Sequence, residues 1–166
     1  MPDSSARLAE LEAEATIRRV AARYMALCDE PPTTAPGPDF ADLFTTDLIW
    51  EGVGRKAGAE FSRVEGRDRL LAWFDTMRQP PKYVFNLHFL TSEAIVVGPE
   101  DATGTWVMAQ TAVRTSKDGE LRLARITIRF RCEDNQWRIA HFQTESLFRL
   151  DFAQDQIAGL LQGLPT

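Results

Sequence analysis

The residues with the clearest chemical potential are a histidine and an aspartate that lie far apart in the sequence. His88 is one of two histidines among 166 residues, and it lies in the largely apolar and aromatic run at residues 83–89. Asp29 ends a helical pattern, where the helix dipole disfavours a carboxylate by up to ~1 kcal/mol. An imidazole accepts a proton when a partner fixes its tautomer and stabilises the imidazolium. The pattern therefore predicts a His/Asp acid–base pair.

Structural explanations of these residues remain open. Asp29 could be solvated in the turn that follows its helix, and His88 could be a core histidine bonded to a carbonyl group. For His141, within a Trp-x-Ile-x-His strand, the structural role is preferred. Cys28 and Cys132 are too few and too far apart for a CxxC motif, so we expect small, buried, apolar residues.

Three helices are predicted before His88. Residues 4–28 carry apolar side chains at helical spacing behind a serine cap, and a proline-rich segment at 31–38 ends that helix. A short helix over 39–44, capped by Asp39, comes next. A strand over 48–53 and a loop or poorly ordered hairpin over 54–65 follow. The segment over 54–65 is a candidate for a lid. Residues 66–77 form the third helix, which Pro80 and Pro81 close.

After Pro81 the apolar period changes to two. The runs 83–97, 104–114, 121–132 and 136–148 are separated by turn residues, which predicts antiparallel hairpins. The alternation in 121–132 slips near Ala124, which indicates a bulge. Arg125, Arg129 and Arg131 share one parity and predict a solvated or interface face, with an anion site as the alternative. Residues 151–164 predict a terminal helix or a mobile tail.

Composition limits the classes of partner. The chain has 24 acidic and 19 basic residues, a net charge of −5 and a pI near 5.1, which argues against nucleic acid or anionic membrane as a partner. The start lacks the apolar core of a secretory signal, and no run of ~18 apolar residues is present. We expect one domain over residues 1–166, with a core at about 14–148, in a soluble cytoplasmic protein.

Several anchors occur in an order that is similar to a known family. The chain resembles the SnoaL-like branch of the nuclear-transport-factor-2-like (NTF2-like) superfamily, which includes scytalone dehydratase, hexachlorocyclohexane dehydrochlorinase and bile acid 7α-dehydratase. The matching anchors are Tyr24-Met25-Ala26-Leu27-Cys28-Asp29, Asp39-Phe40, Leu43-Phe44, Trp50, Gly66, His88, Gly104-Thr105-Trp106 and Trp137-Arg138-Ile139-Ala140-His141.

The resemblance implies an α+β fold, a cone-shaped barrel in which three N-terminal helices pack on a highly curved, mostly antiparallel sheet around an apolar pocket. It implies a catalytic pair of Asp29 and His88, with Tyr24 one turn earlier as a third candidate. It also implies that neither a metal nor an organic cofactor is needed.

The chain departs from the dehydratase pattern at two positions. Gln110 stands where those relatives place a further His or Asp, and it can only form hydrogen bonds. Ser146 stands near the place of an arginine used by the bile-acid enzyme. The pocket-lining candidates for ligand binding are Gln110, Trp106, Trp50, Asn86 and Phe142. If the parity of His141 faces inward, Gln143 and Glu145 join them.

The predicted function is a lyase or isomerase that acts on a small hydrophobic ring-containing molecule such as a polyketide, steroid or aromatic. One alternative is a noncatalytic ligand-binding protein, and another is a structural protein like the small subunit of a dioxygenase. We expect a homo-oligomer, dimer or trimer, through an outer sheet face that carries Arg114, Arg125, Arg129 and Arg131.

Overall fold

A long amphipathic helix, α1, begins the fold. The computed structural model describes residues 3–30, 37–54, 63–78 and 80–157, and α1 spans Ser4–Asp29 within them. Ile17, Ala21 and Tyr24 are buried at intervals of three or four, so one stripe of the helix faces the sheet. The cap differs from the expected serine, because the side chain of Asp3 accepts a hydrogen bond from the Ser5 amide at 3.2 Å.

The other helices are short or follow the first strands. α2 spans Pro38–Ala41 after Gly37 and makes no side-chain cap bond, so the predicted Asp39 cap is wrong. This helix ends early because Phe44 already begins a strand. α3 spans Arg67–Arg78 and comes after β1 and β2, and α4 spans Gln154–Ile157. The predicted third helix and the strand before it are confirmed, but only α1 and α2 precede the sheet, so the description of three N-terminal helices needs correction.

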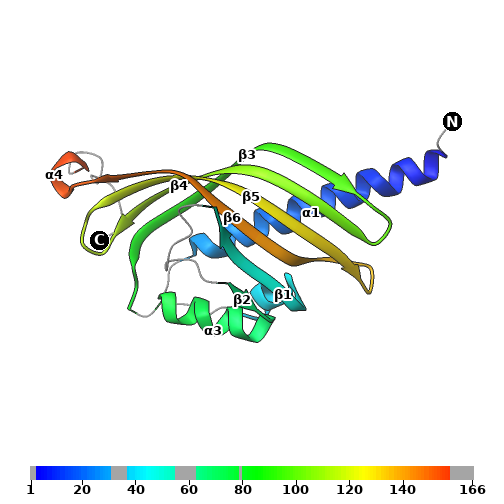
Figure 1. Cartoon of the computed structure of the whole chain (residues 1–166), viewed down its shortest axis with the longest axis horizontal. Coiled ribbons are helices and arrows are strands. Elements are labelled where there is room, and N and C mark those ends of the chain that lie inside the picture. The colour runs from blue at the N-terminus through cyan, green and yellow to red at the C-terminus, as the bar shows by residue number, and fades with distance from the viewer. Residues whose placement is uncertain (1–2, 31–36, 55–62, 79, 158–166) are drawn as a thin grey trace.

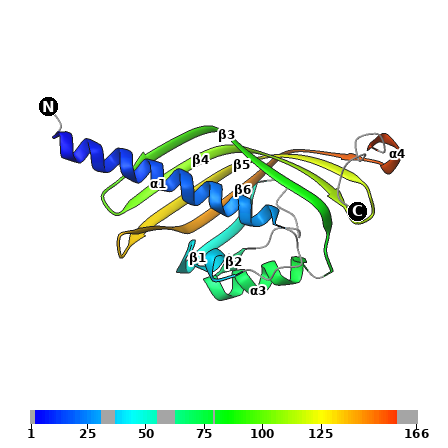
Figure 2. The same cartoon turned by 180° about the vertical axis from the view of Figure 1, so that it is seen from behind.

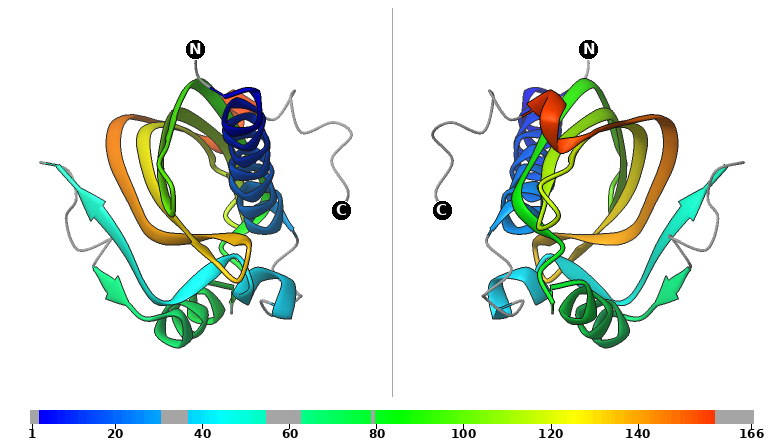
Figure 3. Two further views of the ribbon diagram at one scale, coloured as in Figure 1. Left: turned by 90° about the vertical axis from the view of Figure 1, so that its right-hand side faces the viewer. Right: turned by 90° about the vertical axis from the view of Figure 1, so that its left-hand side faces the viewer.

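Six strands form one strongly bent sheet in the order β2-β1-β6-β5-β4-β3. The strands are β1 Phe44–Val53, β2 Val64–Glu65, β3 Tyr83–Val97, β4 Asp101–Arg114, β5 Gly119–Glu133 and β6 Gln136–Phe152. All neighbours are antiparallel except β1 and β6. Figures 1 and 2 show α1 lying across the long strands, with its N-terminal end projecting past them. Figure 3 shows the sheet curling round α1 without closing on itself.

Two bulges make β6 change faces along its length. Ile139 pairs with Phe130 and His141 with Arg129, so Ala140 is an extra residue. Ser146 pairs with Ala124 and Phe148 with Leu123, so Leu147 is a second. The shift expected near Ala124 is confirmed, but its extra residue is in β6. As a result β5 alternates without interruption, with Glu120, Arg122 and Ala124 on the concave face that holds the core.

The hydrophobic core fills the concave side of the sheet beneath α1. Its fully buried members come from α1, α2, β1, α3, β5 and β6: Ile17, Phe40, Phe44, Leu48, Leu70, Ile126, Ile128, Phe130 and Ile139. The predicted loop over 54–65 falls mostly on residues 55–62, outside the described residues. Across the described ranges, no helix combines the length and apolar character needed to cross a membrane.

Candidate active site

Asp29 and His88 meet where the end of α1 reaches strand β3. Asp29 Oδ1 lies 2.5 Å from His88 Nδ1, and the backbone amide of His88 donates to Asp29 Oδ2 at 3.0 Å. The side chains are 15% and 12% exposed, so the pair is shielded but not sealed. An ionised carboxylate only accepts hydrogen bonds, so this geometry places the proton on Nδ1 and leaves Nε2 with a lone pair.

Asn86 contacts this carboxylate, and Gln110 in turn holds Asn86. Asn86 Nδ2 donates to the carbonyl oxygen of Cys28 at 3.2 Å and lies 3.5 Å from Asp29 Oδ1. Gln110 Nε2 donates to Asn86 Oδ1 at 2.7 Å. These amides, expected to bind a ligand, are therefore bonded to each other. Their contacts fix the end of α1 against β3 and β4.

Tyr24 lies one turn before the pair, deep in the apolar interior. Trp50 Nε1 donates to its hydroxyl oxygen at 3.2 Å, and burial raises the pKa of Tyr24 well above its ordinary value. Burial also raises the pKa of the neighbouring Cys28 thiol to about 12. Both groups therefore stay protonated at neutral pH, and the phenol is the stronger hydrogen-bond donor of the two.

These residues border one cavity of about 510 Å³, within the size range of small-molecule sites. Of the residues predicted from sequence, seven line it: Tyr24, Asp29, Trp50, Asn86, His88, Gln110 and Phe142. Trp106 does not. Its indole donates to Glu93 at 3.1 Å, and its ring covers Gly104 so closely that any side chain there would collide with it. Trp106 is a core residue, which corrects its assignment to the pocket.

The bulges of β6 decide which of its side chains reach the cavity. Phe142, Thr144 and Ser146 line it. The opposite parity, which sequence left as a second possibility, faces the convex side: Gln143 donates to Glu51 at 2.8 Å, and Glu145 pairs with Arg125 at 3.0 Å. Gln143 and Glu145 are therefore not cavity residues.

His141 belongs to a separate network on the convex face. Its Nε2 lies 2.8 Å from Glu51 Oε1, and its Nδ1 lies 2.7 Å from a guanidinium nitrogen of Arg129. Because a guanidinium only donates, Nδ1 accepts and Nε2 carries the proton in the neutral ring. Hydrogen bonds from Gln143, His141 and Arg63 lower the pKa of Glu51 to about 2. These contacts support the structural role preferred for His141.

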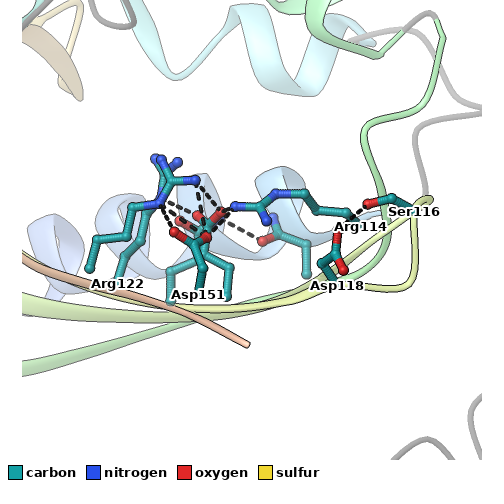
Figure 4. Close-up of polar contacts among 9 residues, drawn as sticks. Arg114, Ser116, Asp118, Arg122 and Asp151 are labelled. Carbon is teal, nitrogen blue, oxygen red and sulfur yellow. Dashed lines mark hydrogen bonds and ion pairs between the residues drawn. The ribbon is translucent and has the colours of Figure 1, made fainter. Parts of the chain in front are cut away.

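A charged cluster on the concave face was not predicted. The Glu120 side chain is 0% exposed and forms ion pairs with Arg114, Arg122 and, at 3.4 Å, Arg149. Arg114 also bonds Asp151 at 2.6 Å, and Figure 4 shows the side chains of Arg114, Arg122 and Asp151 converging above the strands. Arg114 was expected on the outer face, which these contacts correct. The opposite charges of Glu120 and Arg122, two residues apart on one strand, were the signal in the sequence that could have indicated this cluster.

Comparison with models of known protein families places the chain in one of them. A family model described as SnoaL-like domain matches residues 9–143, so the chain belongs to the SnoaL-like family. Its fold is that of the NTF2-like superfamily, as the sequence resemblance predicted. A search of curated protein sequences finds no match.

Solved structures with this fold include enzymes. The chain is similar to a hexachlorocyclohexane dehydrochlorinase, LinA type 2, at a TM-score of 0.74 and 15% identity, over 89% of this chain and 93% of that one. It is similar to a protein described as a putative scytalone dehydratase from Novosphingobium aromaticivorans, at a TM-score of 0.71 and 16% identity. This match covers 86% of this chain and 89% of that one. An NTF2-like protein with a cystatin-like fold from the same species matches at a TM-score of 0.65 and 21% identity, over 89% of this chain and 92% of that one.

Among the described residues, the side chains around the cavity form no candidate metal site. In residues 3–30, 37–54, 63–78 and 80–157, no group of three His, Cys, Asp or Glu side chains is arranged to hold a metal ion. The polar groups in the cavity wall include an imidazole held by a carboxylate, a buried phenol and three cationic side chains, Arg78, Lys82 and Arg122. Such a set is suited to proton transfer and to binding of polar groups on a largely apolar ligand.

Proposed function

We propose that the protein is a cofactor-independent lyase or isomerase in which His88 removes a proton from carbon. The observation that carries the proposal is the 2.5 Å contact between Asp29 Oδ1 and His88 Nδ1 at the wall of a cavity of about 510 Å³. This contact leaves His88 Nε2 as the proton acceptor. The base then contributes ~10²–10⁴-fold to the rate.

Each group has a defined part in the step. The C–H proton passes to His88 Nε2, and Asp29 stabilises the imidazolium that forms. The electron pair of the C–H bond forms a new C=C bond, and either a leaving group departs from the adjacent carbon or a conjugated carbonyl oxygen takes up the charge. Tyr24, which burial keeps protonated, donates to that oxygen.

The cavity wall favours a hydrophobic, ring-containing substrate. Trp50 and Phe142 stack with a centroid distance of 5.7 Å and an interplanar angle of 3°, and Trp73 adds a third ring 4.9 Å from Trp50. All three line the cavity. Flat aromatic, polyketide-like or steroid-like molecules pack well on such surfaces.

Proton abstraction can be tested without knowing the natural substrate. The wild-type protein in deuterium oxide should incorporate deuterium next to the carbonyl group of a bicyclic ketone such as 2-tetralone faster than buffer does, and His88→Ala should return the rate to that of buffer. Wild-type protein that binds the ketone but exchanges it no faster than buffer would instead support a noncatalytic ligand-binding function.

We also propose that the chain self-associates through one end of the convex sheet face. Phe89 and Phe148 lie in one cross-strand row, and their side chains are 51% and 42% exposed. Leu150 lies in the adjacent row and is 43% exposed. Adjacent exposed apolar rows of this kind mark protein interaction surfaces. Arg125, expected to contribute to this surface, is instead paired with Glu145.

A further inference from the structure

We propose that the cavity recognises an anionic group on its ligand, a carboxylate in the simplest case, through Arg122. This inference deepens the proposed function, on which it rests, by assigning the substrate class: a hydrophobic ring system that carries a negative charge. Three features of Arg122 carry the inference: its place in the sheet, its anchoring and its position in the cavity wall.

Arg122 stands in the same cross-strand row as the proposed base. His88 pairs with Gln110, Gln110 with Arg122, and Arg122 with Arg149. Directly paired residues share a face of the sheet, so the row projects from the concave side. His88 and Arg122 are two strand spacings apart, or roughly 10 Å between backbones. A ligand anchored at Arg122 therefore extends over Gln110 toward the imidazole.

The guanidinium of Arg122 is held in place by the buried carboxylate of Glu120. Its Nε forms an ion pair with Glu120 Oε1, and the Glu120 side chain is 0% exposed. A carboxylate buried this deeply stays charged only with close cationic partners. Glu120 also forms ion pairs with Arg114 and Arg149. The pairing with Glu120 therefore fixes the orientation of the Arg122 guanidinium.

Arg122 is also the cation of this cluster that reaches the cavity. Among the described residues of the cluster shown in Figure 4, Arg122 lines the cavity, whereas Arg114 and Arg149 do not. The Arg122 side chain is 13% exposed. In such a shielded place, a charge-assisted hydrogen bond to a carboxylate is about twice as strong as a neutral one. The planar guanidinium also matches a carboxylate in shape.

Binding of two matched probes tests the inference. Naphthalene-2-carboxylate and its uncharged amide should be titrated calorimetrically into wild-type protein at neutral pH. The carboxylate should bind about tenfold more tightly than the amide. Equal affinity, or no detectable binding of the carboxylate at millimolar concentration, would overturn the inference, and this comparison requires no variant.

Variants then assign the preference to Arg122. Arg122→Met should abolish the preference and leave amide affinity unchanged, whereas Arg122→Lys should retain part of it. Arg149→Met is the matched control, because it also removes a partner of Glu120 but not a cavity residue, and it should keep the preference. A preference that survives in Arg122→Met, or is lost equally in Arg149→Met, contradicts the assignment.

The failure of this inference is distinguishable from that of the proposed function. His88→Ala should keep the carboxylate preference, since binding at Arg122 needs no proton transfer. A wild-type protein that exchanges carbon-bound protons but binds both probes equally would retain the proposed chemistry and lose only the anion site.

Discussion

The two carboxylate oxygens of Asp29 contact two different nitrogen atoms of His88, one in the ring and one in the backbone. Oδ1 contacts the ring nitrogen Nδ1 at 2.5 Å, and Oδ2 accepts from the His88 backbone amide at 3.0 Å. Two contacts to one residue fix both the position of the carboxylate and the orientation of the ring. The end of α1, where a carboxylate is otherwise disfavoured, is thereby tied to β3.

We expect Asp29→Asn to lower the rate of proton abstraction about 10²–10⁴-fold. The asparagine amide can donate to Nδ1, which favours the tautomer with a proton on Nε2 and removes the base. Ligand affinity should stay nearly unchanged, because the apolar wall remains. Deuterium exchange and calorimetry on the same protein separate the two effects, and a variant with wild-type exchange would rule out this role for Asp29.

Asn86 should matter more than Gln110, because Gln110 reaches Asp29 only through Asn86. We expect Asn86→Ala to lower kcat about tenfold or more by loosening the carboxylate, and Gln110→Ala to lower it about two- to tenfold. KM should change little in both, as befits positioning residues. Thr111→Ala, on the opposite face of β4, serves as the control. The reverse order of effects would show that Gln110 contacts the substrate itself.

The hydrogen bonds around Glu51 on the convex face should make the free energy of unfolding depend on pH in the acidic range. The pKa of Glu51 is lowered from 4.5 to about 2, first by the hydrogen bond from Gln143. A lowered folded-state pKa stabilises the protein above the unfolded value, and this contribution is lost as the pH falls from 4.5 towards 2. The free energy of unfolding should therefore decrease over this window by ~1–3 kcal/mol more in wild type than in Glu51→Gln.

Urea denaturation at several pH values measures this difference. Glu10→Gln, on the exposed side of α1, is the control and should follow the wild-type curve. Parallel curves for wild type and Glu51→Gln would show that the network contributes nothing to the acid dependence.

The proposed self-association predicts a change in mass. Phe148→Asp places a charge in the exposed apolar row and should shift the protein to a smaller species in light scattering after size exclusion, with an unchanged circular dichroism spectrum. Arg125→Ala should keep the wild-type mass, because its partner Glu145 belongs to the same chain. A wild-type protein that is only monomeric would contradict the interface.

The sequence predicted the fold and the meeting of Asp29 with His88, because the anchors of the family and the apolar periods are local signals. It left open which face of β6 reaches the cavity, because single extra residues at Ala140 and Leu147 reverse the alternation and depend on pairing with β5. Arg114 was expected on the outer face although it has the parity of Gln110 on β4, which pairs with β5 without a register shift. The Glu120 cluster was missed because charged residues on a strand ordinarily indicate a solvated face.

The protonation of the two histidine rings tests the central claim most directly, and ¹⁵N NMR of histidine-labelled protein measures it. With only two histidines in the chain, His88→Ala assigns both spectra. The geometry predicts that neutral His88 carries its proton on Nδ1, with an unprotonated Nε2, and that neutral His141 carries its proton on Nε2. Asp29→Asn should shift only the His88 pattern. A wild-type His88 ring protonated on Nε2 in its neutral form would contradict its role as the base.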